Sequence, residues 1–192
     1  MARAKEFDRE LVLERAMEYF WERGYEAASM RELLDAMEIG RQSLYDTFGD
    51  KHSLFLASLE HYYQLGLGSI IAELGSPDGG LSAIEAYFDR LSRQMSKRPH
   101  RSCLLINSAV EVAPHDPEVA VIVNRFVKRL RKAFAAALKV AVEKGEARVE
   151  DVDATAWNLT NSAMGFGPMS KARISYKDLK RVNEQILNNL RA

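Results

Sequence analysis

Helical spacing runs through nearly the whole of this sequence and limits it to one class of fold. Apolar residues recur every three or four positions in each long segment, as they do on one face of an α-helix. In no window do apolar and polar residues alternate with a period of two, which is the pattern of a half-buried strand. We therefore expect an all-α protein of about nine helices, and a hydrophobic content of 47% is ample for its core.

Capping signals predict where the first helices begin and end. Asp8 can cap a first helix and Gly24 can end it. Ser29 and Glu32 have the spacing of a capping box, in which each side chain satisfies a free backbone amide at a helix start. This box predicts a second helix, which we expect to end near Glu38.

The stretch IGRQSLYDTFGDK, from Ile39 to Lys51, predicts a short third helix between two turns that contain glycine. Isolated helices below about 12 to 15 residues are marginal in water, so Leu44 and Phe48 must hold this one by packing. The opposite face carries side chains that donate hydrogen bonds, namely Arg41, Gln42, Ser43, Tyr45 and Thr47. Two brief helices behind a longer one have the order of a helix-turn-helix unit, and such a face suits a DNA major groove.

Further helices are expected along the rest of the chain. Asp50 starts a fourth helix that should run to about Leu74, where a Gly- and Pro-rich stretch ends it. The others are expected at 81–95, at 103–112, from Asp116 to Gly145, from Asp153, and from Tyr176 to the end. The segment MGFGPM at 164–169 should kink or end its helix, because Gly and Pro cost about 1 and 3 kcal/mol relative to Ala. A bend that shapes a pocket or seam and a plain helix end both remain open.

Composition excludes several kinds of site. Residues 1–51 contain eight Lys or Arg and twelve Asp or Glu, so any DNA contact must use a few well-placed cations instead of a general basic patch. The single cysteine, Cys103, excludes an intramolecular disulfide and a cysteine-built zinc finger. No apolar run reaches the roughly 18 residues of a membrane span. We expect a cytoplasmic protein with no membrane partner, no metal site and no cofactor.

The segment FWERGYEAASMREL, followed by IGRQSLYDTFGDKHSLFLA, resembles the N-terminal domain of the tetracycline-repressor (TetR) family of transcription regulators. The likeness covers roughly residues 8–60 and joins an aromatic-rich helix end, a Gly-Tyr corner, a capping box and a terminal Phe-Gly-Asp-Lys. The remainder is similar in helix number and length, and CLLINSAVEVAPHDPEV is similar to one branch of the family. The resemblance implies a DNA-binding domain at 1–51, linked by the helix from 50, and a regulatory, ligand-binding and dimerisation domain at 52–192.

The resemblance also implies a function. A homodimer would place two recognition helices in successive major grooves of a palindromic double-stranded operator, usually as a repressor, and a small-molecule effector would release it. Matching positions imply phosphate contacts from Ser29, Arg31, Tyr45 and Lys51, and base-edge contacts from Arg41, Gln42, Ser43 and Thr47. The chemistry agrees, because Arg can bind guanine and Gln can bind adenine through two hydrogen bonds each.

Candidates for the regulatory half are large apolar residues on the expected helices. Those for a ligand pocket are Phe88, Met95, Leu104, Phe126, Trp157, Met164 and Phe166, and each is equally a candidate for plain core packing. By the resemblance, the last two helices build the dimer, with Trp157, Leu159, Ala163, Ile186 and Leu190 as seam candidates. Cys103 begins a Cys-Leu-Leu stretch that responds to oxidants or electrophiles in one branch of the family. Arg98, His100 and Arg101 would lower its pKa, whereas burial would make it inert.

Two other classes of protein compete with this interpretation. An enzyme is not expected, because the sequence contains no Gly-rich phosphate loop, no H-E-x-x-H, no G-x-S-x-G and no carboxylate pair at a recognisable spacing. A helical scaffold that binds partner proteins without binding DNA remains the alternative. Protection of a palindrome in a footprint would separate the regulator from the scaffold.

Overall fold

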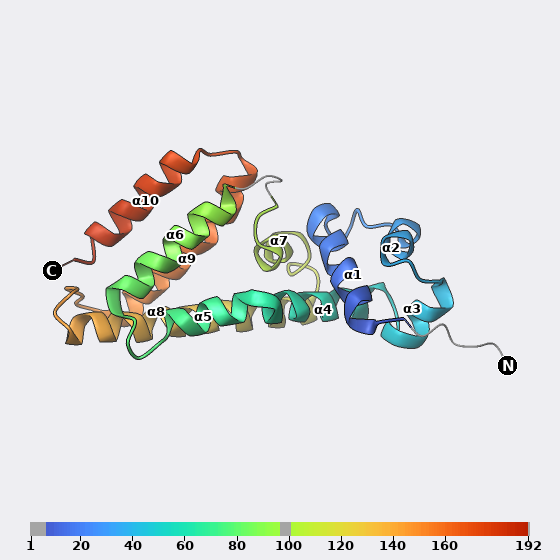
Figure 1. Ribbon diagram of the computed structural model, residues 1–192, viewed down its shortest axis with the longest axis horizontal. Helices are drawn as coiled ribbons and strands as arrows, with labels where there is room; N and C mark the ends of the chain where they lie inside the picture. The colour runs from blue at the N-terminus through green and yellow to red at the C-terminus, as the bar shows by residue number, and fades with distance from the viewer. Residues whose placement is uncertain (1–6, 97–100, 192) are drawn as a thin grey trace.

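The computed structural model describes residues 7–96 and 101–191, and in them the chain forms α-helices, one π-helical segment and no β-strand. The elements are α1 (Arg9–Arg23), α2 (Met30–Met37), α3 (Arg41–Phe48), α4 (Lys51–Tyr62), η1 (Tyr63–Leu67), α5 (Gly68–Leu74), α6 (Gly80–Met95), α7 (Leu104–Glu111), α8 (Pro117–Glu143), α9 (Val152–Lys171) and α10 (Tyr176–Asn188). The helices α4, η1 and α5 follow one another as a single rod (Figure 1). The all-α class with about nine helices is therefore confirmed.

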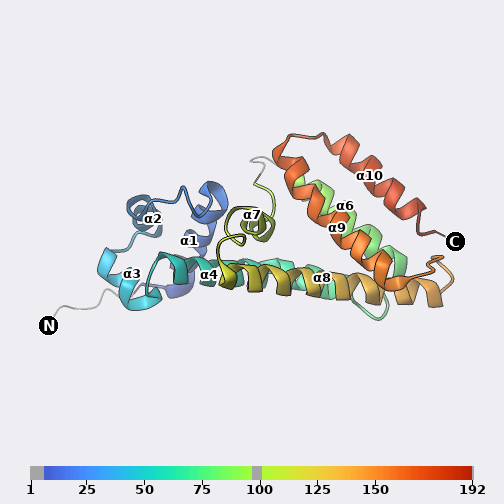
Figure 2. The ribbon, with the colours of Figure 1, turned by 180° about the vertical axis from the view of Figure 1, so that it is seen from behind.

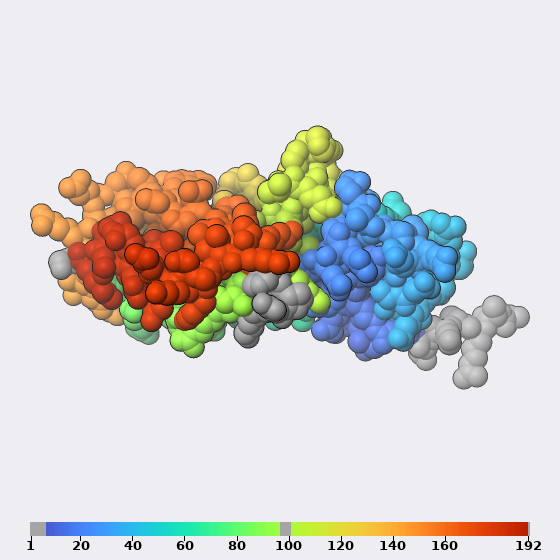
Figure 3. Space-filling model, turned by 90° about the horizontal axis from the view of Figure 1, so that it is seen from above, coloured from blue at the N-terminus to red at the C-terminus, as the bar shows by residue number. Residues whose placement is uncertain are grey.

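The helices form an elongated molecule with a small bundle at each end. Figure 1 shows α1, α2 and α3 gathered at the N-terminal end and α6, α9 and α10 at the other. The rod of α4 and α5 runs beside α8 between the two ends, as the reverse view in Figure 2 also shows. Helix α7 lies between α1 and the C-terminal bundle, and Figure 3 shows it projecting beside the blue N-terminal part. The N-terminal bundle therefore touches the rest through α4 and α7.

Most predicted helix ends are confirmed by their caps. Asp8 accepts hydrogen bonds from the backbone N–H groups of Glu10 and Leu11, and Gly24 ends α1 with a positive φ of 84°. Asp116 caps α8 in the same way, with Pro117 at the first helical position. Side-chain capping of free N–H groups is a local interaction, which is why sequence spacing alone locates it.

The fourth helix differs from the prediction. Instead of continuing unbroken to Leu74, it passes through η1, where Gly66 has non-helical backbone angles. A glycine inside a helix lowers the stability of the helix by about 1 kcal/mol relative to Ala, so the regular helix is weakest at that residue. Helix α9 also differs slightly from the prediction at its start, since its cap is Asp151 and it begins at Val152 instead of at Asp153.

Helix α9 continues through the MGFGPM segment to Lys171, with Pro168 inside it, so of the two alternatives, a bend and a plain helix end, the helix end is excluded. Packing supplies the reason. A Cβ at Gly167 would lie 2.3 Å from the hydroxyl oxygen of Ser102, so this residue brings α9 into close contact with the segment before α7. Phe166 beside it is buried in the core. Gly167 allows α9 to lie close to the segment before α7, and these contacts stabilise the helix.

Two aromatic clusters build the core. In the C-terminal bundle, Phe88 stacks on Phe134 at 5.7 Å and lies 5.9 Å from Phe166 between ring centroids. At the junction of α1 and α4, Phe20 meets Phe55 edge to face at 5.0 Å. Such pairs add about 0.5–1.5 kcal/mol beyond their burial. The second cluster fixes α4 to the N-terminal bundle.

Of the described helices, none has the length and apolar character to cross a membrane.

Candidate functional site

Helix α3 presents the face that the sequence predicted. Leu44 is completely buried and Phe48 nearly so, which fixes the two-turn helix against the bundle. The outward positions carry Arg41, Gln42 and Tyr45, all exposed, with Ser43 and Thr47 half-buried at the sides of the face. Helix α3 lies at the N-terminal end of the molecule (Figure 1), and these five side chains leave it on the sides that Leu44 and Phe48 do not bury. Their chemistry is that of hydrogen-bond donation to base edges and phosphates.

Asp46 is the one acid on this helix. Its carboxylate accepts a hydrogen bond of 2.8 Å from the side-chain amide of Gln42. The two residues are four positions apart, so they are neighbours on the helix surface. The contact fixes the orientation of the Gln42 amide and draws the Asp46 carboxylate sideways along the helix.

The flanking residues lie at the starts of α2 and α4. Ser29 accepts a hydrogen bond of 3.2 Å from the N–H of Glu32 and donates one of 2.8 Å to the Glu32 carboxylate, and Arg31 beside it is exposed. The ammonium of Lys51 lies 4.4 Å from the centre of the Tyr25 ring, and partial burial lowers the pKa of Lys51. Both helix starts also offer backbone N–H groups, which favour anions such as phosphate.

A cavity of about 290 Å³ lies between the N-terminal bundle and the regulatory half. Its walls come from several elements and include Met17, Trp21, Tyr62, Leu65, Leu67, Ile70, Tyr87, Leu91, Gln94, Met95, Cys103, Ile106, Phe126, Leu130 and Met164. Among the residues predicted to line a pocket, Met95, Phe126 and Met164 are in this wall. Cavities of about 300–1,000 Å³ with mostly apolar walls and a few polar groups are typical of small-molecule sites.

The other predicted pocket residues lie elsewhere. Phe88, Leu104 and Phe166 are buried in the protein core. Trp157 is 46% exposed on α9, and the Arg131 guanidinium lies 5.4 Å from the centre of its ring. Large apolar residues at helical spacing fill cores first, so spacing cannot tell a pocket wall from a core.

Sequence reasoning missed three aromatic residues of the cavity wall: Trp21, Tyr62 and Tyr87. Trp21 and Tyr62 meet edge to face at 5.1 Å between ring centroids, which joins α1 to α4. The only signal in the sequence was the aromatic-rich end of the first helix, which is equally typical of a packed core. Assignment to a cavity needed the tertiary structure.

The two tyrosine hydroxyls of the wall remain uncharged at neutral pH. Burial raises the pKa of Tyr62 well above its ordinary value, and the neighbouring Cys103 thiol adds to the effect. Burial likewise raises the pKa of Tyr87. These groups can therefore exchange hydrogen bonds with a ligand without contributing charge.

Cys103 is the N-cap residue of α7 and is 6% exposed. Burial raises the pKa of its thiol, and hydrogen bonds from nearby backbone N–H groups and Tyr62 only partly oppose this. Of the two alternatives, an activated thiol and a buried, inert one, the structure therefore favours the buried one, because desolvation outweighs the helix start. Arg98 and His100 lie outside the described residues, and Arg101 instead pairs with Glu18 and Glu22 of α1.

We expect the Cys103 thiol to react slowly with iodoacetamide in the folded protein near neutral pH. Its raised pKa keeps the nucleophilic thiolate scarce, and burial blocks access. Because the unfolded chain releases this proton at a lower pH than the folded chain, alkaline pH above the ordinary thiol pKa should also reduce stability. Mass spectrometry at several pH values measures the alkylation rate of the folded protein and, as the control, that of the urea-unfolded protein. A folded rate equal to the unfolded one would restore the case for a thiol sensor.

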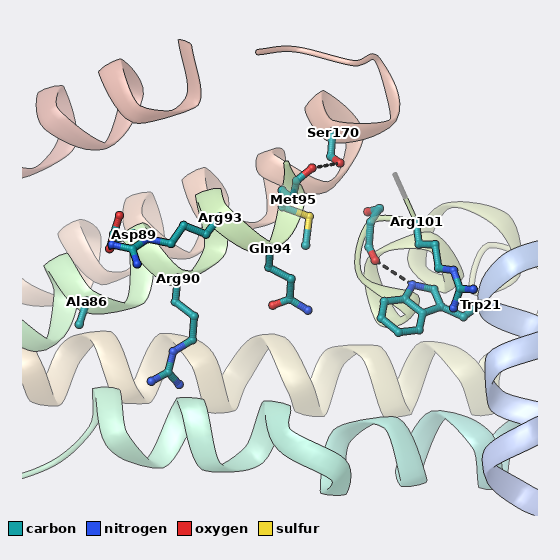
Figure 4. A pocket seen from close by; sticks show the side chains of 10 residues that line it. Trp21, Ala86, Asp89, Arg90, Arg93, Gln94, Met95, Arg101 and Ser170 are labelled. Atoms are coloured by element: carbon teal, nitrogen blue, oxygen red, sulfur yellow. Dashed lines mark hydrogen bonds and ion pairs between the residues drawn. The ribbon is translucent and has the colours of Figure 1, made fainter. Parts of the chain in front are cut away.

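Trp21, Gln94 and Met95 line both this cavity and a second one of about 710 Å³, which Figure 4 shows. The indole N–H of Trp21 donates a 2.8 Å hydrogen bond to the backbone oxygen of Ser102 (Figure 4). The second cavity contains three arginines with carboxylate partners: Arg90 with Glu73, Arg93 with Asp89, and Arg101 with Glu18. Its positive charges are thus largely compensated within the protein.

Two more contacts lie near the junction of the N-terminal bundle with the regulatory half: the first joins the two parts, and the second joins α4 to the start of α8. The Glu111 carboxylate at the end of α7 accepts a 3.0 Å hydrogen bond from the backbone N–H of Glu26, between α1 and α2. His52 of α4 lies 2.6 Å from Asp116, the cap residue of α8. Desolvation raises the pKa of the Asp116 carboxyl, but hydrogen bonds from the backbone N–H groups of Val119 and Glu118 and the contact with His52 together outweigh it, so the net shift of the pKa is downward. The orientation of the N-terminal bundle is therefore determined by polar contacts as well as by packing.

The seam candidates divide into two groups. Leu159, Ala163 and Leu190 are buried inside the single chain, so they cannot meet a second copy, and their assignment to a seam is wrong. Trp157 and Ile186 retain exposed surface on α9 and α10. The intramolecular packing of α9 and α10 uses one apolar face of each, which the sequence pattern could not assign to the inside or the outside.

Within residues 7–96 and 101–191 no cluster of metal-binding side chains occurs.

Comparison with known proteins gives consistent matches. The family profile described as "Bacterial regulatory proteins, tetR family" matches residues 12–58, and "Tetracyclin repressor-like, C-terminal domain" matches residues 80–186. The HTH-type transcriptional regulator YezE of Bacillus subtilis (strain 168) is 41% identical over 157 residues, which is 81% of each chain. The HTH-type transcriptional repressor ComR of Escherichia coli (strain K12) is 32% identical over 62% of this chain and 57% of its own length.

Solved structures agree over almost the whole chain. A cysteine mutant of the TetR family transcriptional regulator CifR, complexed with double-strand operator DNA, is 28% identical with a TM-score of 0.84 and covers 97% of this chain and 98% of its own. The reduced form of E. coli NemR is 21% identical with a TM-score of 0.84, over 95% of this chain and 96% of its own, which shows the shared fold. The likeness thus extends over the N-terminal helices as well as the regulatory half.

Proposed function

This chain belongs to the TetR family of bacterial regulatory proteins and is a transcriptional regulator with an N-terminal helix-turn-helix. From that premise, we propose that it is a repressor that binds a palindromic operator as a homodimer and releases it when a small molecule enters the cavity beside α1. The observation that carries the proposal is the α3 surface, where exposed donor side chains project from a two-turn helix held by Leu44 and Phe48. The similar regulator CifR has been solved on operator DNA with the same overall fold.

The contacts with DNA divide into two kinds. We assign the base edges to Arg41, Gln42, Ser43 and Thr47 on α3, and the phosphates to Ser29, Arg31, Tyr45 and Lys51 around it. Support comes from their shared placement on one end of the molecule and from the free N–H groups at the starts of α2 and α4. Phosphate contacts set the register on the duplex, and base contacts specify the sequence.

The domains have separate roles in this proposal. Residues 1–51 would bind DNA, and residues 52–192 would bind the effector and form the dimer. The outer faces of α9 and α10, with Trp157 and Ile186, are the proposed seam, because Trp157 is exposed and Ile186 is only half-buried in the single chain. Two copies must then hold their α3 helices about 34–36 Å apart to reach successive major grooves. Because its partner would be genomic DNA, the protein would act in the cytoplasm. It would neither catalyse a reaction nor need a cofactor.

A footprint on random genomic fragments tests this function. We expect protection of a palindrome, with an affinity that falls steeply as salt rises, because each phosphate contact releases counterions. Size-exclusion chromatography with light scattering gives the oligomeric state. Absence of any protected site at low salt would favour the helical scaffold that binds partner proteins instead.

A further inference from the structure

The DNA-binding half contributes part of the wall of the inner cavity, the one of about 290 Å³. Glu14, Met17, Glu18 and Trp21 line it, and all four belong to α1. The opposite walls come from α4 to α9. A molecule in this cavity would therefore touch both halves of the protein at once, and its surroundings would change whenever the two halves moved relative to each other.

The charge of the wall argues against an anionic ligand. Among its described residues the charged side chains are Glu14 and Glu18, both acids, and Glu18 is paired with Arg101. A carboxylate or phosphate would lose its hydration there without gaining a cation. The arginines of the neighbouring cavity already have carboxylate partners, so they offer a weak alternative.

The remaining chemistry of the wall favours an aromatic molecule with a polar atom. Trp21, Tyr62, Tyr87 and Phe126 supply ring surfaces, and aromatic pairs gain from edge-to-face and offset contacts. The Tyr87 hydroxyl, which is uncharged at neutral pH and whose pKa burial raises further, can donate a hydrogen bond to an acceptor, whereas the Tyr62 hydroxyl already contacts the Cys103 thiol. A volume of about 290 Å³ restricts the molecule to a small one.

We propose that the effector is a small, uncharged aromatic molecule with a hydrogen-bond acceptor, and that Trp21 of the DNA-binding domain is one of the residues it contacts. This inference rests on the proposed function, and it names the ligand class and the route by which the ligand acts. The route is direct contact with α1.

Trp21 is suited to this role because it is attached to the regulatory half. Its N–H donates to the Ser102 backbone, and the Arg101 guanidinium lies 5.4 Å from the centre of its ring. Ser102 in turn lies against Gly167 of α9. If operator binding and ligand binding prefer different positions of α1, each must weaken the other by the same factor, since coupling between two sites is reciprocal.

The ligand class is tested with two probes of nearly equal size, 2-acetylnaphthalene and 2-naphthoate. The chain has two tryptophans, so a Trp157→Phe variant leaves Trp21 as the sole indole emitter. We expect saturable quenching of Trp21 fluorescence by 2-acetylnaphthalene and binding of 2-naphthoate that is weaker by about tenfold or more. Equal or tighter binding of 2-naphthoate, or no change in Trp21 emission with either probe, would overturn the assignment.

The route is tested with operator DNA and a matched pair of variants. Trp21→Phe removes the hydrogen bond to Ser102, and Phe126→Leu alters the wall on α8 without touching α1. The measured quantity is the ratio of operator Kd with and without saturating 2-acetylnaphthalene, for which couplings of about 5- to 150-fold are typical. We expect Trp21→Phe to reduce this ratio to near one, and Phe126→Leu to raise the probe concentration needed while leaving the ratio at saturation unchanged.

The outcomes separate the two proposals. A ratio for Trp21→Phe equal to that of the unaltered protein would exclude the route through α1. Loss of ligand-free operator binding in Trp21→Phe, with the fold intact by circular dichroism, would instead make Trp21 a structural support for α3 and overturn its role as a ligand contact. Failure of the unaltered protein to bind any operator would refute the proposed function, whereas the fluorescence titration needs no DNA and judges the ligand class by itself.

Discussion

Replacing Arg41 with Ala should lower the operator affinity of the dimer by about 30-fold or more. Arg41 is the first residue of α3 and is exposed, so its guanidinium can reach a guanine edge in the major groove. A bidentate contact of this kind is worth about 1–3 kcal/mol, and a palindrome contains it twice. The combined loss of about 2–6 kcal/mol corresponds to at least one order of magnitude in Kd.

The measurement for Arg41→Ala is a fluorescence-anisotropy titration with the footprinted operator and with a scrambled duplex. A lost base contact should reduce affinity for the operator more than for the scrambled duplex, whereas a lost phosphate contact would weaken both equally. Lys128→Ala is the control, because Lys128 is an exposed cation on α8 outside the proposed interface. Equal loss in the two variants would mean that only overall charge had been measured.

Replacing Leu44 with Ala should abolish operator binding by a different cause. Leu44 is completely buried, and together with Phe48 it anchors a helix of eight residues. Truncating a buried Leu to Ala costs about 2–5 kcal/mol, and a helix this short has no independent stability to draw on. We expect α3 to unfold locally while the regulatory half keeps its structure.

Amide hydrogen exchange measures this local effect. In Leu44→Ala, protection should fall across α3 and stay unchanged in α8 and α9. Tyr45→Ala is the matched control, since Tyr45 is the next residue of the same helix and its side chain is exposed. It should weaken operator binding without loss of protection. Full protection of α3 in Leu44→Ala would show that the helix is held by contacts other than this side chain.

Interactions between near neighbours in the chain were predictable from the sequence. The caps at Asp8, Ser29, Asp50 and Asp116 each bind backbone N–H groups a few residues away, and the structure has all of them. The outward face of α3 followed for a similar reason, because helical spacing alone decides which side Leu44 buries.

Features that depend on distant parts of the chain were not predictable. The π-helical segment at Gly66, the place of Trp21 in a cavity wall and the burial of Leu159 all result from packing between helices. The raised pKa of the Cys103 thiol could not be predicted for the same reason, since the helix start is a local feature and the desolvation is not. Periodicity shows that a face is apolar, but it does not show whether a core, a ligand or a second subunit covers it.

The shared cavity wall bears on the construction of chimeric biosensors from this protein. Exchanging residues 1–51 for those of another regulator, to redirect the chimera to a new promoter, would also replace Met17 and Trp21 and install a foreign surface beside the inducer. A graft limited to α2 and α3 would keep the native α1 and so preserve the response to the inducer. In this protein the boundary suitable for exchange lies after α1, inside the segment that reads the promoter.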